Sequence, residues 1–149
     1  MIPSDEFVIV GLPDTIWFPE AALGTLGAGP LSFLLFPVNQ PERFDAVLTD
    51  SAGHVREIRV KQPNAGSPWI WGAFKLSGTT LRELYDLWCE RDAKDEYVGT
   101  LVNAYLARGG TATGVRAGEA YVDVGTLRGY REALRLLSNR PAESVGAVT

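Results

Sequence analysis

The chain has 149 residues, 46% of them apolar and 21% charged, and a domain of this size buries roughly 68–70% of its unfolded surface. Its net charge of −4 argues against a nucleic-acid partner, the single Cys89 excludes an internal disulfide, and no apolar run approaches the ~20 residues of a membrane-spanning helix. We therefore expect a soluble cytoplasmic protein without a membrane partner, with one domain over residues 1–140 and a flexible tail over residues 141–149.

The first half of the chain is rich in short apolar runs that predict strands. Residues 7–10 form a continuous apolar run ended by Gly11 and Pro13, which is typical of a strand buried on both faces of a sheet. The other elements expected in this half are a helical turn, a second core strand and two strands of a hairpin, at residues 19–26, 31–38, 43–49 and 55–61.

The second half predicts strands and amphipathic helices. Residues 69–76 indicate a strand interrupted by Gly72, a residue that permits the close approach of a ligand or another backbone. Thr80 and Glu83 have the spacing of a capping box and predict the start of a helix, in which Cys89 is expected to belong to the core. The later elements are a helix at residues 97–108, strands at residues 111–116 and 119–124, and a helix capped by Thr126 with the apolar stripe Leu127, Tyr130, Leu134 and Leu137.

This order of elements favours a layered α/β domain, with a Rossmann-like mixed sheet and flanking helices. A parallel neighbour of the first strand would need a crossover connection, and no such connection precedes residue 7. We therefore interpret the domain as part of a larger sheet.

Two aspartates follow predicted strands and could hold a metal ion. Asp14 comes after the strand at residues 7–10, and Asp123 lies near the end of the strand at residues 119–124. Mg²⁺ is often held by one or two carboxylates together with substrate phosphates, and it would offset charge during phosphoryl transfer. The residues alone leave a second interpretation open, because an aspartate in such a position is often a turn residue or a helix cap.

Other side chains are less specific. Lys61 ends a predicted strand, where its ammonium could meet a phosphate or be a solvated edge lysine. Tyr121 could stack on a sugar face, although aromatic residues in strands mostly belong to the core. His54 lies beside a turn and is expected to be exposed and non-catalytic.

Four segments, in order, resemble the sugar-phosphate nucleotidyltransferases, the nucleotide-sugar pyrophosphorylases that include glucose-1-phosphate thymidylyltransferases. They are residues 7–16, 55–63, 69–74 and 121–126. The last, Tyr121-Val-Asp-Val-Gly-Thr126, is similar to the Trp-x-Asp-x-Gly-Thr motif of the family, and the second resembles a strand ending in Glu-Lys-Pro. The resemblance implies Asp14 and Asp123 as Mg²⁺ ligands, and Lys61, Gly72 and Tyr121 as contacts of the sugar phosphate.

The resemblance also has departures. Val60 stands where the family has a glutamate that holds sugar hydroxyls, and no counterpart of the opening Gly-x-Gly-Thr-Arg loop is present, so the chain resembles the C-terminal, sugar-binding portion. A complete relative joins a sugar 1-phosphate to a nucleoside triphosphate and releases pyrophosphate. Without half of the phosphate clamp we expect weak or no turnover. The alternative is a non-catalytic fragment or an assembly module whose sheet edge pairs with itself, as a homo-oligomer, or with an N-terminal partner chain.

Overall fold

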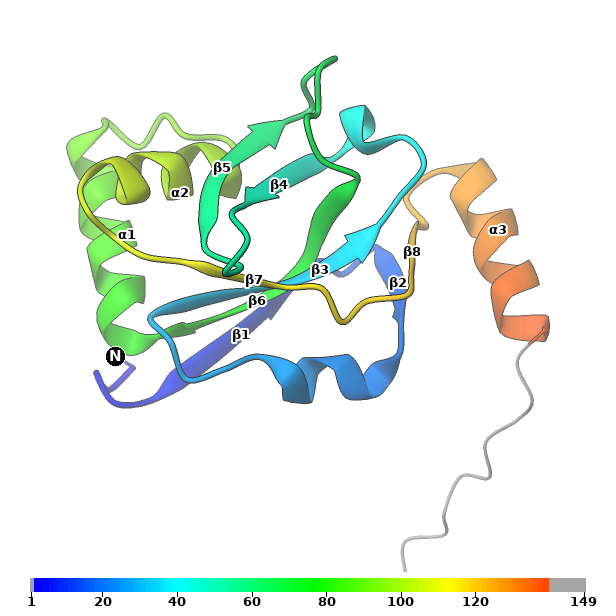
Figure 1. Cartoon of the computed structure of the whole chain (residues 1–149), viewed down its shortest axis with the longest axis horizontal. Helices are drawn as coiled ribbons and strands as arrows, with labels where there is room; N and C mark the ends of the chain where they lie inside the picture. Colours follow the sequence, from blue (N-terminus) through cyan, green and yellow to red (C-terminus); the bar gives the residue numbers. More distant parts are fainter. Residues whose placement is uncertain (1, 140–149) are drawn as a thin grey trace, which may run out of the picture.

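The computed structural model describes residues 2–139, and the predicted tail over residues 141–149 lies outside these residues. The described residues form a six-stranded mixed sheet, a two-stranded ribbon, three α-helices and two 3-10 helices (Figure 1). The strands are β1 (Phe7–Gly11), β2 (Thr15–Phe18), β3 (Leu31–Pro37), β4 (Asp45–Thr49), β5 (Val55–Val60), β6 (Trp69–Ser77), β7 (Thr113–Val115) and β8 (Ala120–Asp123). The helices are η1 (Glu20–Thr25), η2 (Pro41–Arg43), α1 (Gly78–Glu90), α2 (Val98–Ala107) and α3 (Leu127–Ser138). The predicted α/β class with a mixed sheet is confirmed.

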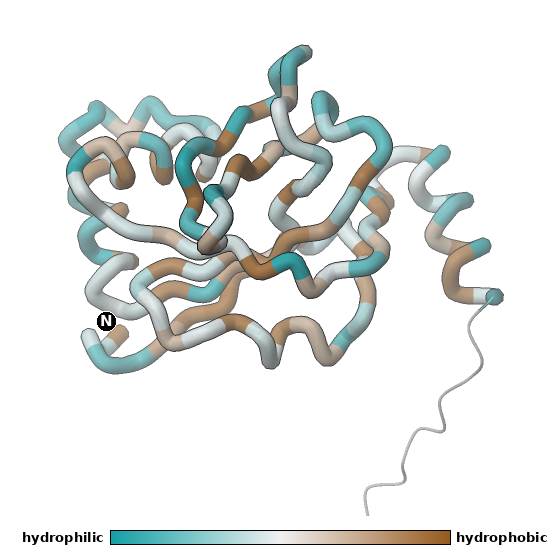
Figure 2. The backbone as a smooth tube through the Cα atoms, viewed as in Figure 1, coloured by the Kyte–Doolittle hydropathy of each residue, from teal (hydrophilic) through white to brown (hydrophobic). Residues whose placement is uncertain are grey.

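The long strand β6 lies at the centre of the sheet. One of its edges pairs antiparallel with β3, and the other is shared by β4 near its start and by β1 over its second half. The hairpin β4–β5 and the parallel strand β7, beside β3, complete the sheet. Apolar residues are concentrated in these strands, while the outer loops are mostly polar (Figure 2).

Two hydrophobic layers lie on opposite faces of the sheet. On the helix side, α1 and α2 pack on a core that includes Phe33, Trp71 and Phe74, whose ring centroids lie 5.4 to 6.3 Å apart. On the ribbon side, η1 and the strands β2 and β8 cover the fully buried Phe36, whose ring centroid lies 5.6 Å from that of Trp17. In Figure 1 the two helices lie at the left and the ribbon at the right.

The prediction that residues 7–10 are buried on both faces is wrong. β1 pairs only with β6 among the described residues, and the exposed fractions of Phe7 and Ile9 are 42% and 53%. Alternate residues of a strand share a face, so Val8 and Val10 pack against the helix-side core while Phe7 and Ile9 lie on the opposite face, which stays half-exposed. Among residues 2–139 the outer edge of β1 is also unpaired, so β1 combines a free edge with an exposed apolar face.

The helix α3 also differs from a typical surface helix. Its predicted N-cap is confirmed, because the Thr126 side chain accepts a hydrogen bond from the Gly129 amide at 3.0 Å. Its apolar stripe is exposed, however, with exposed fractions from 46% for Leu137 to 67% for Leu127. The buried residues of α3 are the small Gly129 and Ala133. The helix therefore meets the domain through its small residues and stands at its side (Figure 1).

Two predictions about α1 need correction. Its N-cap is Ser77, whose Oγ accepts a hydrogen bond from the Thr80 amide at 3.1 Å, so the helix begins before the predicted capping box. Cys89 is exposed, because Leu84 and Leu87 lie on the face of α1 that packs on the sheet. Within residues 2–139 no helix is both long and apolar enough to cross a membrane.

Candidate functional site

The β2–β8 ribbon brings the two predicted metal ligands together. Thr15 is paired with Asp123, and the Val124 amide donates a hydrogen bond to the Asp14 carbonyl oxygen at 2.8 Å. A Cβ atom placed on Gly125 would lie 3.1 Å from Asp123 Oδ1 and 3.2 Å from Asp14 Oδ2. The two carboxylates therefore approach the same point, and the open space at that point depends on a glycine.

The turn after β8 fixes the position of Asp123. Its Oδ1 accepts a hydrogen bond from the Gly125 amide at 2.8 Å, which is the geometry of an aspartate that caps its own turn. Its carbonyl oxygen would lie 1.6 Å from a Cβ atom on Gly129, so only glycine lets α3 approach β8 this closely. Asp123 thus has a structural role in the turn, and its second carboxylate oxygen forms no hydrogen bond or ion pair with a described residue.

Asp14 and Asp123 suit a hard cation that takes only two of its ligands from the protein. The described residues contain no group of three or more histidine, cysteine or acidic side chains that could hold a metal ion. A dedicated protein cage for zinc or calcium would need such a group. Mg²⁺ commonly keeps several waters and takes one or two carboxylates plus substrate phosphates. Asp14 and Asp123 fit that requirement if phosphate or water supplies the remaining ligands.

Tyr121 lies on the ribbon next to this pair. Its ring centroid is 5.6 Å from that of Phe36 and 5.7 Å from that of Phe44, which it meets edge-on. Burial raises the pKa of Tyr121 to about 12, although a hydrogen bond with the Thr15 side chain opposes this effect. The negative charges of Asp123, Asp14 and Asp45 add to the increase. The phenol therefore stays protonated at neutral pH and can donate a hydrogen bond.

Gly72 lies beneath the aromatic rings of the ribbon side. It is buried in β6, and a Cβ atom at this position would lie 2.6 Å from the Phe36 ring and 3.0 Å from the Tyr121 ring. The glycine thus allows Phe36 and Tyr121 to approach the sheet. Its contact with a sugar stays a prediction.

Lys61 lies at the end of β5, apart from the two aspartates. Its Nζ is 4.8 Å from the centroid of the Tyr97 ring, and its φ angle is 47°, which marks a tight turn. Among the described residues, no hydrogen bond or ion pair joins it to Asp14 or Asp123. Its role at a phosphate stays a prediction.

Asp45 is a candidate that the sequence interpretation missed. Burial raises its pKa, although a hydrogen bond to Oδ2 from Trp71 Nε1 at 3.3 Å and the charge of Lys61 oppose this effect. The negative charge of Asp45 also raises the pKa of Tyr121, so Asp45 interacts both with Lys61 and with the ribbon. The only signal in the sequence is an acidic residue at the start of the apolar segment Phe44-Asp-Ala-Val47.

A groove of about 940 Å³ runs between β8, α3 and the segment at residues 37–44. Tyr121 and Asp123 line it, together with Arg43, Arg128 and the acidic Glu132. Arginine forks suit phosphate and carboxylate ligands. The groove therefore combines two of the predicted site residues with two cations that the sequence alone did not single out.

The fold of this chain is similar to that of a protein whose crystal structure has been solved. A Bacillus anthracis protein assigned as a glucose-1-phosphate thymidylyltransferase, solved in complex with sucrose, matches the chain with a TM-score of 0.72 and 21% sequence identity. The match covers 92% of this chain and 56% of that protein, so the chain spans little more than half of its length. No family model matches the sequence, and no curated protein matches it. The structural similarity shows that the fold is that of part of a nucleotidyltransferase.

Proposed function

We propose that the chain binds a sugar 1-phosphate or a nucleotide-sugar together with Mg²⁺, as the sugar-side portion of a sugar-phosphate nucleotidyltransferase. The observation that carries the proposal is the convergence of Asp14 and Asp123 at Gly125, beside the groove that holds Arg43 and Arg128. In the complete reaction a phosphate oxygen of the sugar 1-phosphate attacks the α-phosphorus of a nucleoside triphosphate. A phosphorus–oxygen bond forms, the bond to the β-phosphate breaks, and pyrophosphate leaves.

Each predicted residue has a chemical role in this proposal. Asp14 and Asp123 would hold Mg²⁺, which offsets the negative charge of the phosphates and fixes their orientation. Tyr121 would donate its hydroxyl hydrogen to the ligand, because its raised pKa keeps the phenol protonated. Lys61 would neutralise the sugar phosphate, and Gly72 would keep the aromatic wall close to the sheet so that a sugar ring can lie against it.

In the related family a glutamate at the position of Val60 holds the sugar hydroxyls, and Asp45 lies next to that position. It is paired with Val60 in the β4–β5 hairpin, so its carboxylate lies on the strand next to the position where a glutamate is missing. A partly buried carboxylate can accept hydrogen bonds from sugar hydroxyls. We propose that Asp45 supplies this acceptor.

Turnover by this chain alone is expected to be weak or absent. The match spans 56% of the thymidylyltransferase, and the groups that bind the nucleoside triphosphate would have to come from residues outside this chain segment. Positioning and electrostatic stabilisation supply most of the catalysis in phosphoryl transfer. We therefore propose that this chain binds the sugar phosphate, and that catalysis also needs the groups that bind the nucleoside triphosphate.

Calorimetric titration of the folded chain with sugar 1-phosphates and nucleotide-sugars, with and without Mg²⁺, tests this proposal. Asp123→Asn keeps the oxygen that accepts from Gly125 and removes the charge, so we expect Mg²⁺-dependent affinity to fall at least about tenfold without unfolding. Asp5→Asn is the matched control, since Asp5 is exposed and β1 separates it from Asp14. Equal binding by both variants, or none by the wild-type chain, would contradict the proposal.

Assembly through the edge of β1 is the second candidate function. The exposed apolar residues Phe7 and Ile9 lie on a strand whose outer edge is unpaired among the described residues. Such an edge is a template for another strand, from a second copy or from an N-terminal polypeptide segment. The partial coverage of the thymidylyltransferase agrees with a domain of a larger unit.

Sedimentation over a range of concentrations tests self-pairing. We expect wild-type chain to dimerise and Ile9→Lys to remain monomeric, because a charge on the edge strand opposes strand addition. Tyr85→Lys, at a position that is 61% exposed on α1, is the control and should dimerise as the wild-type chain does. A monomer at all concentrations would exclude self-pairing and favour an N-terminal segment as the occupant.

A further inference from the structure

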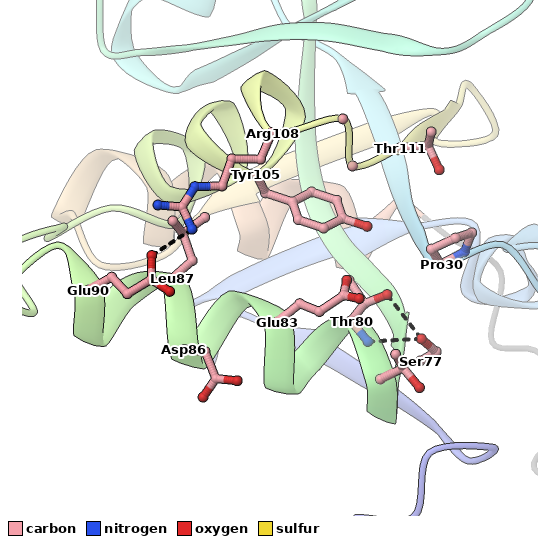
Figure 3. A pocket seen from close by; sticks show the side chains of 13 residues that line it. Pro30, Ser77, Thr80, Glu83, Asp86, Leu87, Glu90, Tyr105, Arg108 and Thr111 are labelled. Atoms are coloured by element: carbon pink, nitrogen blue, oxygen red, sulfur yellow. Dashed lines mark hydrogen bonds and ion pairs between the residues drawn. The ribbon is translucent and has the colours of Figure 1, made fainter.

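A second cavity lies on the helix side of the domain and shares no lining residue with the groove at β8. It measures about 610 Å³ and is bounded by one face of α1, the end of α2 and the turn that follows α2 (Figure 3). Ligand pockets commonly span about 300–1,000 Å³, so the cavity can hold a small organic molecule. Its lining is dominated by carboxylates and hydroxyl groups.

Three carboxylates of α1 form the acidic wall of this cavity. Glu83, Asp86 and Glu90 occur at helical positions i, i+3 and i+7, so they share one face. Arg108 forms an ion pair with Glu90, with Nη1 2.6 Å from Oε2, and this pair neutralises the Glu90 carboxylate. Among the residues that line the cavity no other cation is present, so Glu83 and Asp86 have no opposite charge beside them in this lining.

Tyr105 presents a polar group to this cavity from a second element, α2. The residue is only 8% exposed, yet its hydroxyl points into the cavity (Figure 3) and forms no hydrogen bond with a described residue. A Cβ atom on Gly110 would lie 2.4 Å from this ring, and Gly109 has a φ angle of 91°. The double glycine therefore does more than end α2, because it makes room for a tyrosine ring whose polar end meets the cavity. By contrast, the hydroxyls of Ser77 and Thr80 bond to each other at 3.0 Å.

The spacing of the carboxylates distinguishes an organic cation from a metal ion. Within residues 2–139 these side chains do not form a group of three that could hold a metal. At a helical rise of 1.5 Å per residue, Glu83, Asp86 and Glu90 are separated along the axis by about 4.5 and about 6 Å. Amino groups joined by three or four methylenes have comparable separations, and Pro30 and Leu87 offer apolar contact for such methylenes.

We propose that this cavity binds a linear polyamine, with its ammonium groups against the carboxylates of α1 and an amine hydrogen bond to the Tyr105 hydroxyl. The site is independent of the carboxylate pair at Gly125. A ligand can therefore occupy this cavity without entering the groove at β8. The expected affinity depends on ionic strength, because the carboxylates are exposed and salt screens them.

Titration calorimetry with spermidine at low ionic strength tests this proposal on the whole chain. The double variant Glu83→Gln/Asp86→Asn should lose at least about tenfold in affinity, since two charge-assisted hydrogen bonds are removed. Tyr105→Phe keeps the ring against Gly110 and should lose about three- to tenfold, the range for one hydrogen bond. The charge-matched control is Glu20→Gln/Glu42→Gln, two exposed positions away from the cavity, and it should bind spermidine as the wild-type chain does.

Two results would overturn the proposal. Wild-type chain that does not bind spermidine excludes the site directly. Equal weakening by the double variant and by its control would show general attraction of a cation to an acidic protein. Asp123→Asn should leave spermidine binding unchanged, so failure of the sugar-phosphate proposal and failure of this one are distinguishable.

Discussion

The two faces of the sheet are built in different ways. On the helix side, large side chains such as Phe33 and Leu76 are at most 1% exposed, and α1 and α2 close a continuous core. On the ribbon side, a short pair of strands and glycine turns cover the sheet, and polar groups such as Asp123 reach the surface. The helix side therefore has the larger buried core, while the ribbon side has a smaller buried core beneath strands and turns that bring polar side chains to the surface.

The largest expected effect is on the helix side. Phe33→Ala should reduce the free energy of unfolding by about 3–5 kcal/mol, because it leaves a cavity in contact with Trp71 and Phe74. Urea denaturation measures this change. Tyr85→Ala, at an aromatic residue 61% exposed, should shift the unfolding free energy by less than about 0.5 kcal/mol. Similar losses in both variants would contradict the assignment of the core.

Gly129→Ala is expected to have the next largest effect, on the ribbon side. The added methyl group would collide with the Asp123 carbonyl oxygen, so α3 has to move away from β8, at a cost of about 1–3 kcal/mol. Ligand affinity should fall as well, since Asp123 and Arg128 belong to this junction. Gly27→Ala, where a Cβ atom meets nothing within 4 Å, is the control. A stable Gly129→Ala variant with unchanged binding would show that α3 plays no part in the site.

Alkaline pH should destabilise the ribbon through Tyr121. Its pKa in the folded chain is about 12, above the ordinary tyrosine value of 10.0, so the folded state favours the protonated phenol. This contribution is complete below pH 10 and is lost as the pH rises towards 12, by about 2 kcal/mol. The unfolding free energy of wild-type chain should therefore fall relative to that of Tyr121→Phe over that interval. Parallel curves would contradict the burial of the phenol, and Tyr130→Phe is the exposed control.

The smallest effect is expected for Asp45→Asn. Burial raises the pKa of Asp45, so ionisation costs stability as the pH rises through the folded-state value. The amide oxygen can still accept from Trp71, and the variant should be as stable as wild-type chain or more stable by less than about 1 kcal/mol at neutral pH. Sugar-phosphate affinity should nevertheless fall if Asp45 binds hydroxyls. Unchanged affinity would remove that role and leave the stability prediction intact.

The sequence predicted what depends on local patterns. The apolar run of β3, the turn between β4 and β5, and the Thr126 cap of α3 are encoded within a few residues, and the structure confirms them. The capping site of α1 was misplaced because Ser77 and Thr80 both have side chains that can cap, and only the structure shows which accepts the hydrogen bond.

What depends on distant neighbours could not be predicted. The strand β2 was not expected, since its four residues become a strand through their pairing with β8, more than a hundred positions away. The pairing is also what brings Asp14 to Asp123, a proximity that only the family resemblance suggested. Periodicity showed that Leu127 and Leu134 share a face of α3, but it could not show that no described layer covers them.

A double-mutant cycle of Mg²⁺-dependent ligand binding tests the central claim most directly. If Asp14 and Asp123 hold the same ion, Asp14→Asn, Asp123→Asn and the double variant should lose affinity to a similar extent, because the first substitution already removes the metal. Calorimetry on folded variants measures the three losses. Losses that add independently, or Mg²⁺-dependent binding that survives in the double variant, would contradict a shared metal site at Gly125.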